Sequence, residues 1–154
     1  MASEYQIAHA RLLWAVAGAL PAVVQDLWRR RISNSICSLL LAGGLALGAW
    51  ELGLRGVGSS MLGAASGFSV FLIFYWMRAM GGGDVKLMAG FGALLGAKDI
   101  LTAAMIAAMA GAVIALGVLA LARLRGRAAE SIPYAPPIAF GALAVLASRA
   151  VGGQ

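Results

Sequence analysis

The chain has 154 residues, of which 62% are hydrophobic and only 12% are charged. Soluble domains are nearer half apolar and about a quarter charged, so this composition favours a protein whose surface faces lipid. The formal net charge is +6, but the basic residues stand between apolar runs, as they do in membrane proteins, and nucleic-acid binding is therefore not expected.

Six apolar segments follow one another along the chain. They cover residues 7–25, 36–54, 57–77, 84–96, 100–122 and 134–151. A membrane-crossing helix needs about 20 mostly apolar residues, and most of these segments approach that length. We therefore predict an all-α, polytopic membrane helix bundle of about six transmembrane helices, with residues 1–154 forming a single integral-membrane domain.

The first segment has a second interpretation, a cleaved signal peptide. Arg11 precedes its apolar run, which ends in Ala-Leu-Pro-Ala, and this order is typical of such peptides. Three arginines, residues 29–31, follow the run directly. They resist translocation and favour a helix that stays in the membrane.

Lysine and arginine are unevenly divided between the two sets of helix ends, and this predicts the orientation. One set carries Arg29, Arg30, Arg31, Arg78, Lys86, Arg123, Arg125 and Arg127, whereas the other carries Arg11, Arg55, Lys98 and Arg149. Cytoplasmic loops hold the excess of positive charge. We therefore expect the first set to face the cytoplasm and both termini to face outward.

The fourth segment is too short for a full crossing. Thirteen residues rising ~1.5 Å each span about 20 Å, against a hydrocarbon core of ~30 Å. A helix that reaches the outer face must then begin below the cytoplasmic surface and draw the glycine run 81–83 inward. Irregular backbone at that depth needs a cavity or surrounding protein, so the length predicts a cavity beside Asp84. Local thinning of the bilayer is the alternative.

Pairs of glycines four residues apart recur inside the apolar segments. They are Gly44 with Gly48, Gly63 with Gly67, and Gly92 with Gly96. This GxxxG spacing lets helix backbones approach closely in lipid, so we interpret the pairs as packing positions.

Asp26 and Asp84 differ from the other four acidic residues, because each stands at the junction of an apolar segment with the cytoplasmic side. Glu4, Glu51, Asp99 and Glu130 are expected in the tail or in loops. An acid at a membrane segment usually faces protein or water and marks a function. The alternative is that both aspartates are interfacial anchors paired with arginine.

Two facing carboxylates are sufficient for hydrolysis of a peptide bond. They share one proton, the ionised member activates water and the protonated member donates to the scissile carbonyl. This chemistry needs no metal or cofactor. Asp26 ends its helix and Asp84 begins one, so the helix dipoles favour an ionised Asp84 and a protonated Asp26. Arg29 and Arg30, one turn past Asp26, can cancel this effect.

Three stretches of the chain carry motifs: Gly-Gly-Gly-Asp-Val-Lys-Leu at residues 81–87, Asp-Leu-Trp-Arg-Arg-Arg-Ile-Ser-Asn at residues 26–34, and Ile-Pro-Tyr-Ala-Pro-Pro-Ile-Ala at residues 132–139. Together they resemble the motifs of the type IV prepilin peptidases, a family of GxGD membrane aspartic peptidases. Residues 81–87 match the GxGD signature with a lysine two positions later. Residues 26–34 resemble the first motif, an aspartate followed by a basic stretch and Ile-Pro-Asn, with Ser33 in place of the proline. Residues 132–139, with Gly141, resemble the last helix entry.

The resemblance implies that Asp26 and Asp84 are catalytic. It also implies substrate-binding or motif-supporting roles, assigned to Gly81, Gly83, Lys86, Asn34, Pro133 and Tyr134. The implied substrate is a prepilin or pilin-like protein, whose basic leader is removed on the cytoplasmic side after a glycine. The chain has one cysteine and little room for a methyltransferase region, so it resembles the short branch associated with tight-adherence (Flp) pili.

The motif residues suggest further details and leave alternatives. The glycine loop can let a substrate backbone approach, because glycine has no Cβ. Lys86 can lower the pKa of Asp84, steer the substrate or face lipid headgroups, and we favour the headgroups. A small proton-coupled carrier and a non-catalytic pilus assembly factor are the alternative functions. The sequence does not predict an oligomeric state.

Overall fold

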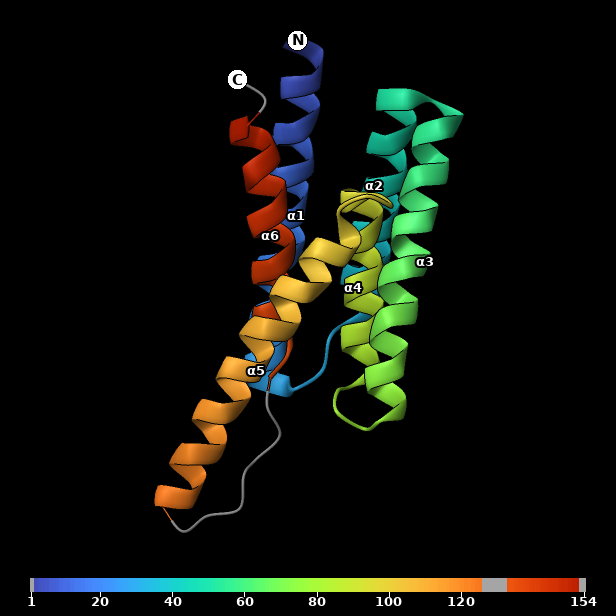
Figure 1. Ribbon diagram of the computed structural model, residues 1–154. Coiled ribbons are helices and arrows are strands. Elements are labelled where there is room, and N and C mark those ends of the chain that lie inside the picture. The colour runs from blue at the N-terminus through green and yellow to red at the C-terminus, as the bar shows by residue number, and fades with distance from the viewer. Residues whose placement is uncertain (1, 126–132, 153–154) are drawn as a thin grey trace.

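The computed structural model describes residues 2–125 and 133–152, with side chains from residue 6 onward. The stretch 126–132, which includes Arg127, Glu130 and Ile132, lies outside the described residues. The regular structure of the described part is helical. It consists of α1 (Ala2–Arg29), α2 (Asn34–Leu52), α3 (Leu54–Trp76), α4 (Gly82–Leu95), α5 (Ile100–Leu124) and α6 (Ala135–Gly152) (Figure 1). The all-α helix bundle predicted from the sequence is confirmed.

Five of these helices are long and apolar enough to cross a membrane, and α4, with 14 residues, is the exception. The start of α1 and the end of α6 lie at one end of the bundle, together with the α2–α3 and α4–α5 connections (Figure 1). We call this the terminal end. The α1–α2 and α3–α4 connections and the last turns of α5 lie at the opposite end, which we call the site end.

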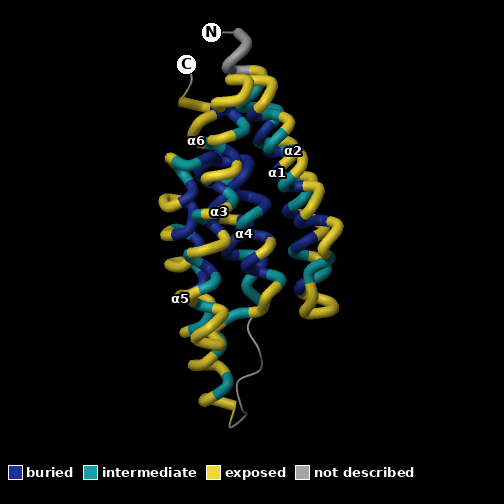
Figure 2. The backbone as a smooth tube through the Cα atoms, turned by 90° about the vertical axis from the view of Figure 1, so that its right-hand side faces the viewer, coloured by how far each residue is buried: buried dark blue, intermediate teal, exposed yellow. Residues whose placement is uncertain are grey.

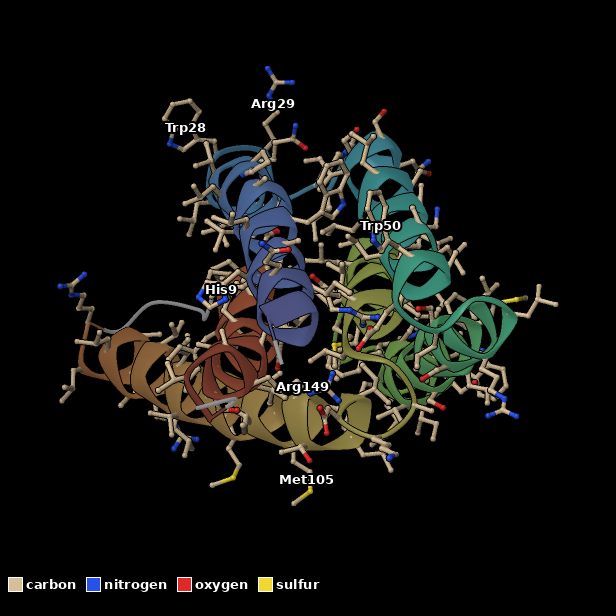
Figure 3. All side chains as sticks on the ribbon, turned by 90° about the horizontal axis from the view of Figure 1, so that it is seen from above. His9, Trp28, Arg29, Trp50, Met105 and Arg149 are labelled. Carbon is tan, nitrogen blue, oxygen red and sulfur yellow. The ribbon has the colours of Figure 1, made fainter. Side chains whose placement is uncertain are left out.

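Helix α4 lies at the centre of the packing. It contacts α2 and α3 along most of its length, whereas α6 packs mainly against α5 and α1. Buried residues concentrate on these inner surfaces, and the outer faces of the helices are exposed (Figure 2). Large apolar side chains such as Trp28 and Met105 point away from the bundle (Figure 3), as expected for helices surrounded by lipid.

Glycines set the close spacing of α2, α3 and α4. A methyl group added to Gly63 of α3 would collide with the backbone of Gly92 and Gly96, and one added to Gly44 of α2 would lie 2.6 Å from the backbone of Ala93. The interpretation of the GxxxG pairs as packing positions is therefore confirmed. Their effect is to hold α4, and with it Asp84, tightly between two longer helices.

Charged side chains connect the helices at the terminal end, and here three expectations are wrong. Arg11, which the sequence places at a helix boundary, is 7% exposed, and its guanidinium donates hydrogen bonds to the Leu94 carbonyl over 2.5 Å and to the Glu51 carboxylate over 2.6 Å. Glu51, expected in a loop, lies in the last turn of α2, and Glu4, expected in the tail, lies in the first turn of α1. The structure extends α1 to Ala2, so Arg11 falls inside the bundle, where the carboxylate offsets the cost of its burial.

Candidate active site

Two buried carboxylates approach the site end from different helices. Asp26 lies in the last turn of α1 and Asp84 in the first turn of α4, and each is 7% exposed. They are the buried acids of the described residues. Burial of an acid is costly and is tolerated where hydrogen bonds or water satisfy it, so the surroundings of both carboxylates determine what they can do.

Both carboxylates line one cavity of about 600 Å³. Its wall combines the glycine run, basic side chains and apolar side chains of α3. The lining residues besides the two aspartates are Arg30, Arg31, Ile32, Asn34, Phe68, Leu72, Tyr75, Gly81, Gly82, Gly83, Val85 and Lys86. The cavity that the short fourth segment predicts beside Asp84 is therefore present.

The chain folds back on Asp84 at the start of α4. Gly81 is the N-cap residue, and its N–H donates to Asp84 Oδ2 over 3.0 Å, which is one half of a capping box. Asp84 lies outside the five candidate spans. Burial raises the pKa of its carboxyl to about 6, the Gly81 N–H acts in the opposite direction, and the Asp26 carboxylate adds a smaller increase.

Asp26 meets a different helix end. Its Oδ2 accepts a hydrogen bond from the N–H of Ala135, the first residue of α6, over 3.0 Å. Burial, the largest influence on the pKa of Asp84, favours a proton on that residue, which is opposite to the assignment expected from the ends of α1 and α4 alone.

Gly83 joins the two sequence motifs around the cavity. A Cβ at this position would lie 3.3 Å from Ile32 Cβ, tighter than ordinary packing, whereas one at Gly82 would have only an ordinary 3.6 Å contact with Tyr75. Gly83 also lines the cavity. Gly83 therefore packs against the loop that follows Asp26. It also faces the space that a ligand would enter.

Three further hydrogen bonds hold that loop in place. Ser33, which stands where the family pattern has proline, accepts a hydrogen bond from Ser35 N–H through Oγ and donates its own N–H to Gln25 Oε1 over 3.0 Å. Its φ is −66°, a value that proline also adopts. Lys86 then reaches across from α4 and donates to Asn34 Oδ1 over 3.0 Å. Hydrogen bonds therefore hold the loop that a proline would stiffen.

The remaining motif residues lie behind the cavity. Pro133 and Tyr134 precede α6, are half-buried and do not line the cavity. The structure thus gathers Asp26, Asp84, Gly81, Gly83, Asn34 and Lys86 around one space and leaves Pro133 and Tyr134 outside it. Tyr134 packs on α5, where a Cβ at Gly111 would lie 3.1 Å from its ring.

Sequence reasoning missed the apolar wall of the cavity. Phe68, Leu72 and Tyr75 occupy positions i, i+4 and i+7 of α3 and line it together. This spacing on one helix face was the available signal, but it was indistinguishable from ordinary packing inside an apolar run.

The arrangement can perform acid–base chemistry on a bound substrate. Two carboxylates that share a cavity can hold one proton between them, with one member accepting from water and the other donating. Among the residues that the structure describes, no group of three or more His, Cys, Asp and Glu side chains lies close enough to hold a metal ion.

Comparison with known proteins agrees with this geometry. A family model described as the type IV leader peptidase family matches residues 12–116, a stretch that includes both aspartates. A prepilin leader peptidase/N-methyltransferase of Burkholderia pseudomallei (strain 1026b) is 32% identical over 122 residues, which cover 75% of this chain and 38% of that protein.

Two further relatives carry the same description. The one from Bacillus subtilis (strain 168) is 33% identical over 87 residues, covering 55% of this chain and 34% of its own length. The one from Aeromonas hydrophila is 29% identical over 122 residues, covering 75% and 41%. The chain thus matches well under half the length of these relatives. No solved structure gives a significant match.

Proposed function

Because the chain belongs to the type IV leader peptidase family, we propose that it is a membrane aspartic endopeptidase that removes the basic leader peptides of prepilins or pilin-like proteins. The observation that carries the proposal is that Asp26 and Asp84, buried acids from two different helices, line one cavity at the site end. In the proposed reaction Asp26 takes a proton from water, and Asp84 donates its proton to the oxygen of the scissile carbonyl.

A second cavity beside the first suits the rest of such a substrate. A cavity of about 380 Å³ between α2, α3 and α4 shares Asn34, Phe68 and Lys86 with the first. Small residues, Cys37, Ser38, Ala89 and Gly90, form much of its wall, and small side chains let a helix approach in lipid. We propose that the apolar helix that follows the cleaved bond lies here.

The orientation follows from charge. Seven of the eleven basic residues that the structure describes lie at or beside the site end (Figure 1), so the positive-inside rule turns that end toward the cytoplasm of a bacterial inner membrane. A cleavage site at this face leaves the hydrophilic leader in the cytoplasm and the apolar helix in the bilayer. The leader then stays in water and the apolar helix stays in lipid, so neither part of the substrate has to change its solvent.

The decisive experiment is co-expression with a tight-adherence prepilin, followed by gel and mass analysis of the pilin. Wild type should shorten the pilin after a glycine. Asp26→Asn and Asp84→Asn should each abolish processing at matched membrane levels, whereas Asp99→Asn, which changes an acid at the terminal end, should not. Processing by both of the first two variants would mean that the aspartates are not catalytic.

The position of the substrate helix has its own test. A photo-crosslinking residue at Ser38, which lines the second cavity, should capture the pilin helix. The same residue at Met61, exposed on α3 and outside both cavities, is the matched control. Equal capture from the two positions would contradict the proposed path. A carrier or an assembly factor, by contrast, would bind the pilin without shortening it.

A further inference from the structure

The entry of α6 makes one specific contact with Asp26. Ala135 is fully buried, and its N–H donates to Asp26 Oδ2 over 3.0 Å between positions 109 residues apart. Neither Tyr134 nor Ala135 lines the cavity. The donor therefore belongs to residues outside the lining of that cavity.

The sequence at the start of α6 leaves few backbone N–H groups besides that of Ala135. The first N–H groups of a helix have no partner within the helix and compete for nearby acceptors. Here the second and third positions are Pro136 and Pro137, which have no N–H. The N–H of Ile138 is used by the Tyr134 carbonyl, over 3.2 Å. Of the first four positions, only Ala135 thus offers a donor to another part of the chain.

The entry is itself held in place by α5. A Cβ added to Gly111 would lie 3.1 Å from Tyr134 Cε1 and 3.7 Å from Pro137 Cγ, so both rings pack directly on that glycine. Pro137 and Ile138 are almost fully buried. Packing on α5 therefore fixes the position of the Ala135 N–H. The two prolines that follow restrict the backbone beside it.

We propose that residues 134–137 are a positioning element for Asp26. The single N–H of Ala135 fixes one oxygen of the carboxylate, and this orients the carboxylate toward the cavity that it shares with Asp84. Ala135 acts through Asp26 and does not touch the substrate. The kinetic part of this inference rests on the proposed peptidase function, whereas the coupling between Ala135 and Asp26 does not.

The kinetic test removes the N–H and little else. Ala135→Pro deletes the donor at the first helical position, where proline is well accepted, and Ala135→Gly keeps the donor. Losing a hydrogen bond to a charged group corresponds to about a ten- to hundredfold change. We expect kcat for prepilin cleavage by Ala135→Pro to lie that far below kcat for Ala135→Gly, with KM nearly equal. Equal kcat values would overturn the proposal and leave the peptidase function intact.

A thermal unfolding experiment in detergent tests the contact without any substrate. Asp26→Ala leaves the Ala135 N–H without its partner and should lower Tm by about 2–4 °C. In the Ala135→Pro background the same change should cost much less. Equal losses in both backgrounds would overturn the proposal. Coupling without cleavage of any pilin by wild type would instead contradict the proposed function alone.

If Ala135→Pro fails to accumulate, a second variant tests the positioning role of residues 134–137. Gly111→Val pushes Tyr134 and Pro137 away from α5 without changing Asp26 or its donor. We expect a lower kcat with KM nearly unchanged. Gly117→Val, on the same helix with no atom within 4 Å of the added Cβ, is the matched control. Wild-type kcat in Gly111→Val would count against the positioning role.

Discussion

The ammonium group of Lys86 donates a hydrogen bond to the side-chain oxygen of Asn34 over 3.0 Å, and so connects the start of α4 to the start of α2. Both residues line the cavity that contains the aspartates and the second cavity beside it. This contact spans the point where the two spaces meet. It therefore holds together the two motifs that each carry one aspartate.

Removal of this contact should weaken activity without abolishing it. Exposed polar pairs contribute about 0.5–1 kcal/mol, so Lys86→Met should lower kcat/KM about two- to fivefold. Asn34→Ala should do the same, and the double variant should be little worse than either single one. Lys98→Met, which changes the other lysine of the chain, is the control. A fully additive double variant would mean that the two residues act separately.

Gly83 should tolerate a side chain less well than Gly82. An added Cβ at Gly83 lies 3.3 Å from Ile32 Cβ, and the branched side chain of valine would push the two motifs apart. We expect Gly83→Val to abolish prepilin cleavage while the protein still inserts into the membrane. Gly82→Ala meets only an ordinary contact and should remain active. Full activity of Gly83→Val would contradict this account of the glycine.

The raised pKa of Asp84 predicts a pH dependence of stability. Because the pKa is about 6 in the folded protein, the folded state binds more protons than the unfolded state between about pH 4 and pH 6. The free energy of unfolding should therefore fall by about 2 kcal/mol as the pH rises through this window. Asp26, Arg30, Arg31 and Lys86 share the cavity, and of these charges the Asp26 carboxylate raises the pKa of Asp84.

The measurement is Tm in detergent from pH 4 to pH 7, for wild type and for Asp84→Asn. Subtracting the two curves removes the contribution of the other titrating groups. Wild type should lose stability across the window and the variant should lose less. Parallel curves would show that the Asp84 carboxyl titrates at its ordinary value of about 4.

The packing of α4 against α3 should be intolerant of added volume. A side chain at Gly63 collides with the backbone of Gly92 and Gly96, and backbone cannot yield by changing rotamer. Gly63→Val should therefore destabilise the protein by about 1–3 kcal/mol and lower activity, because α4 carries Asp84. Gly117→Ala, which meets no atom within 4 Å, should leave Tm unchanged or raise it. An unchanged Tm in Gly63→Val would show that the helices are not packed this closely.

The sequence by itself determined the helices and drew attention to both aspartates. A chain in lipid must satisfy its backbone hydrogen bonds within each segment, so the length and composition of an apolar run predict a helix without knowledge of its neighbours. The shortness of the fourth segment likewise predicted a cavity beside Asp84, since rise per residue and bilayer thickness are general quantities.

Only the tertiary structure decided what surrounds the two carboxylates. The local helix ends favoured an ionised Asp84, whereas burial raises the pKa of its carboxyl. The hydrogen-bond partner of Asp26 likewise comes from α6, which is distant in sequence. The same limit explains Arg11, whose burial depends on Glu51, 40 residues away along the chain. Desolvation and charge act through space, whereas sequence patterns report neighbours along the chain. A local pattern can therefore locate an ionisable group, but long-range contacts determine its chemistry.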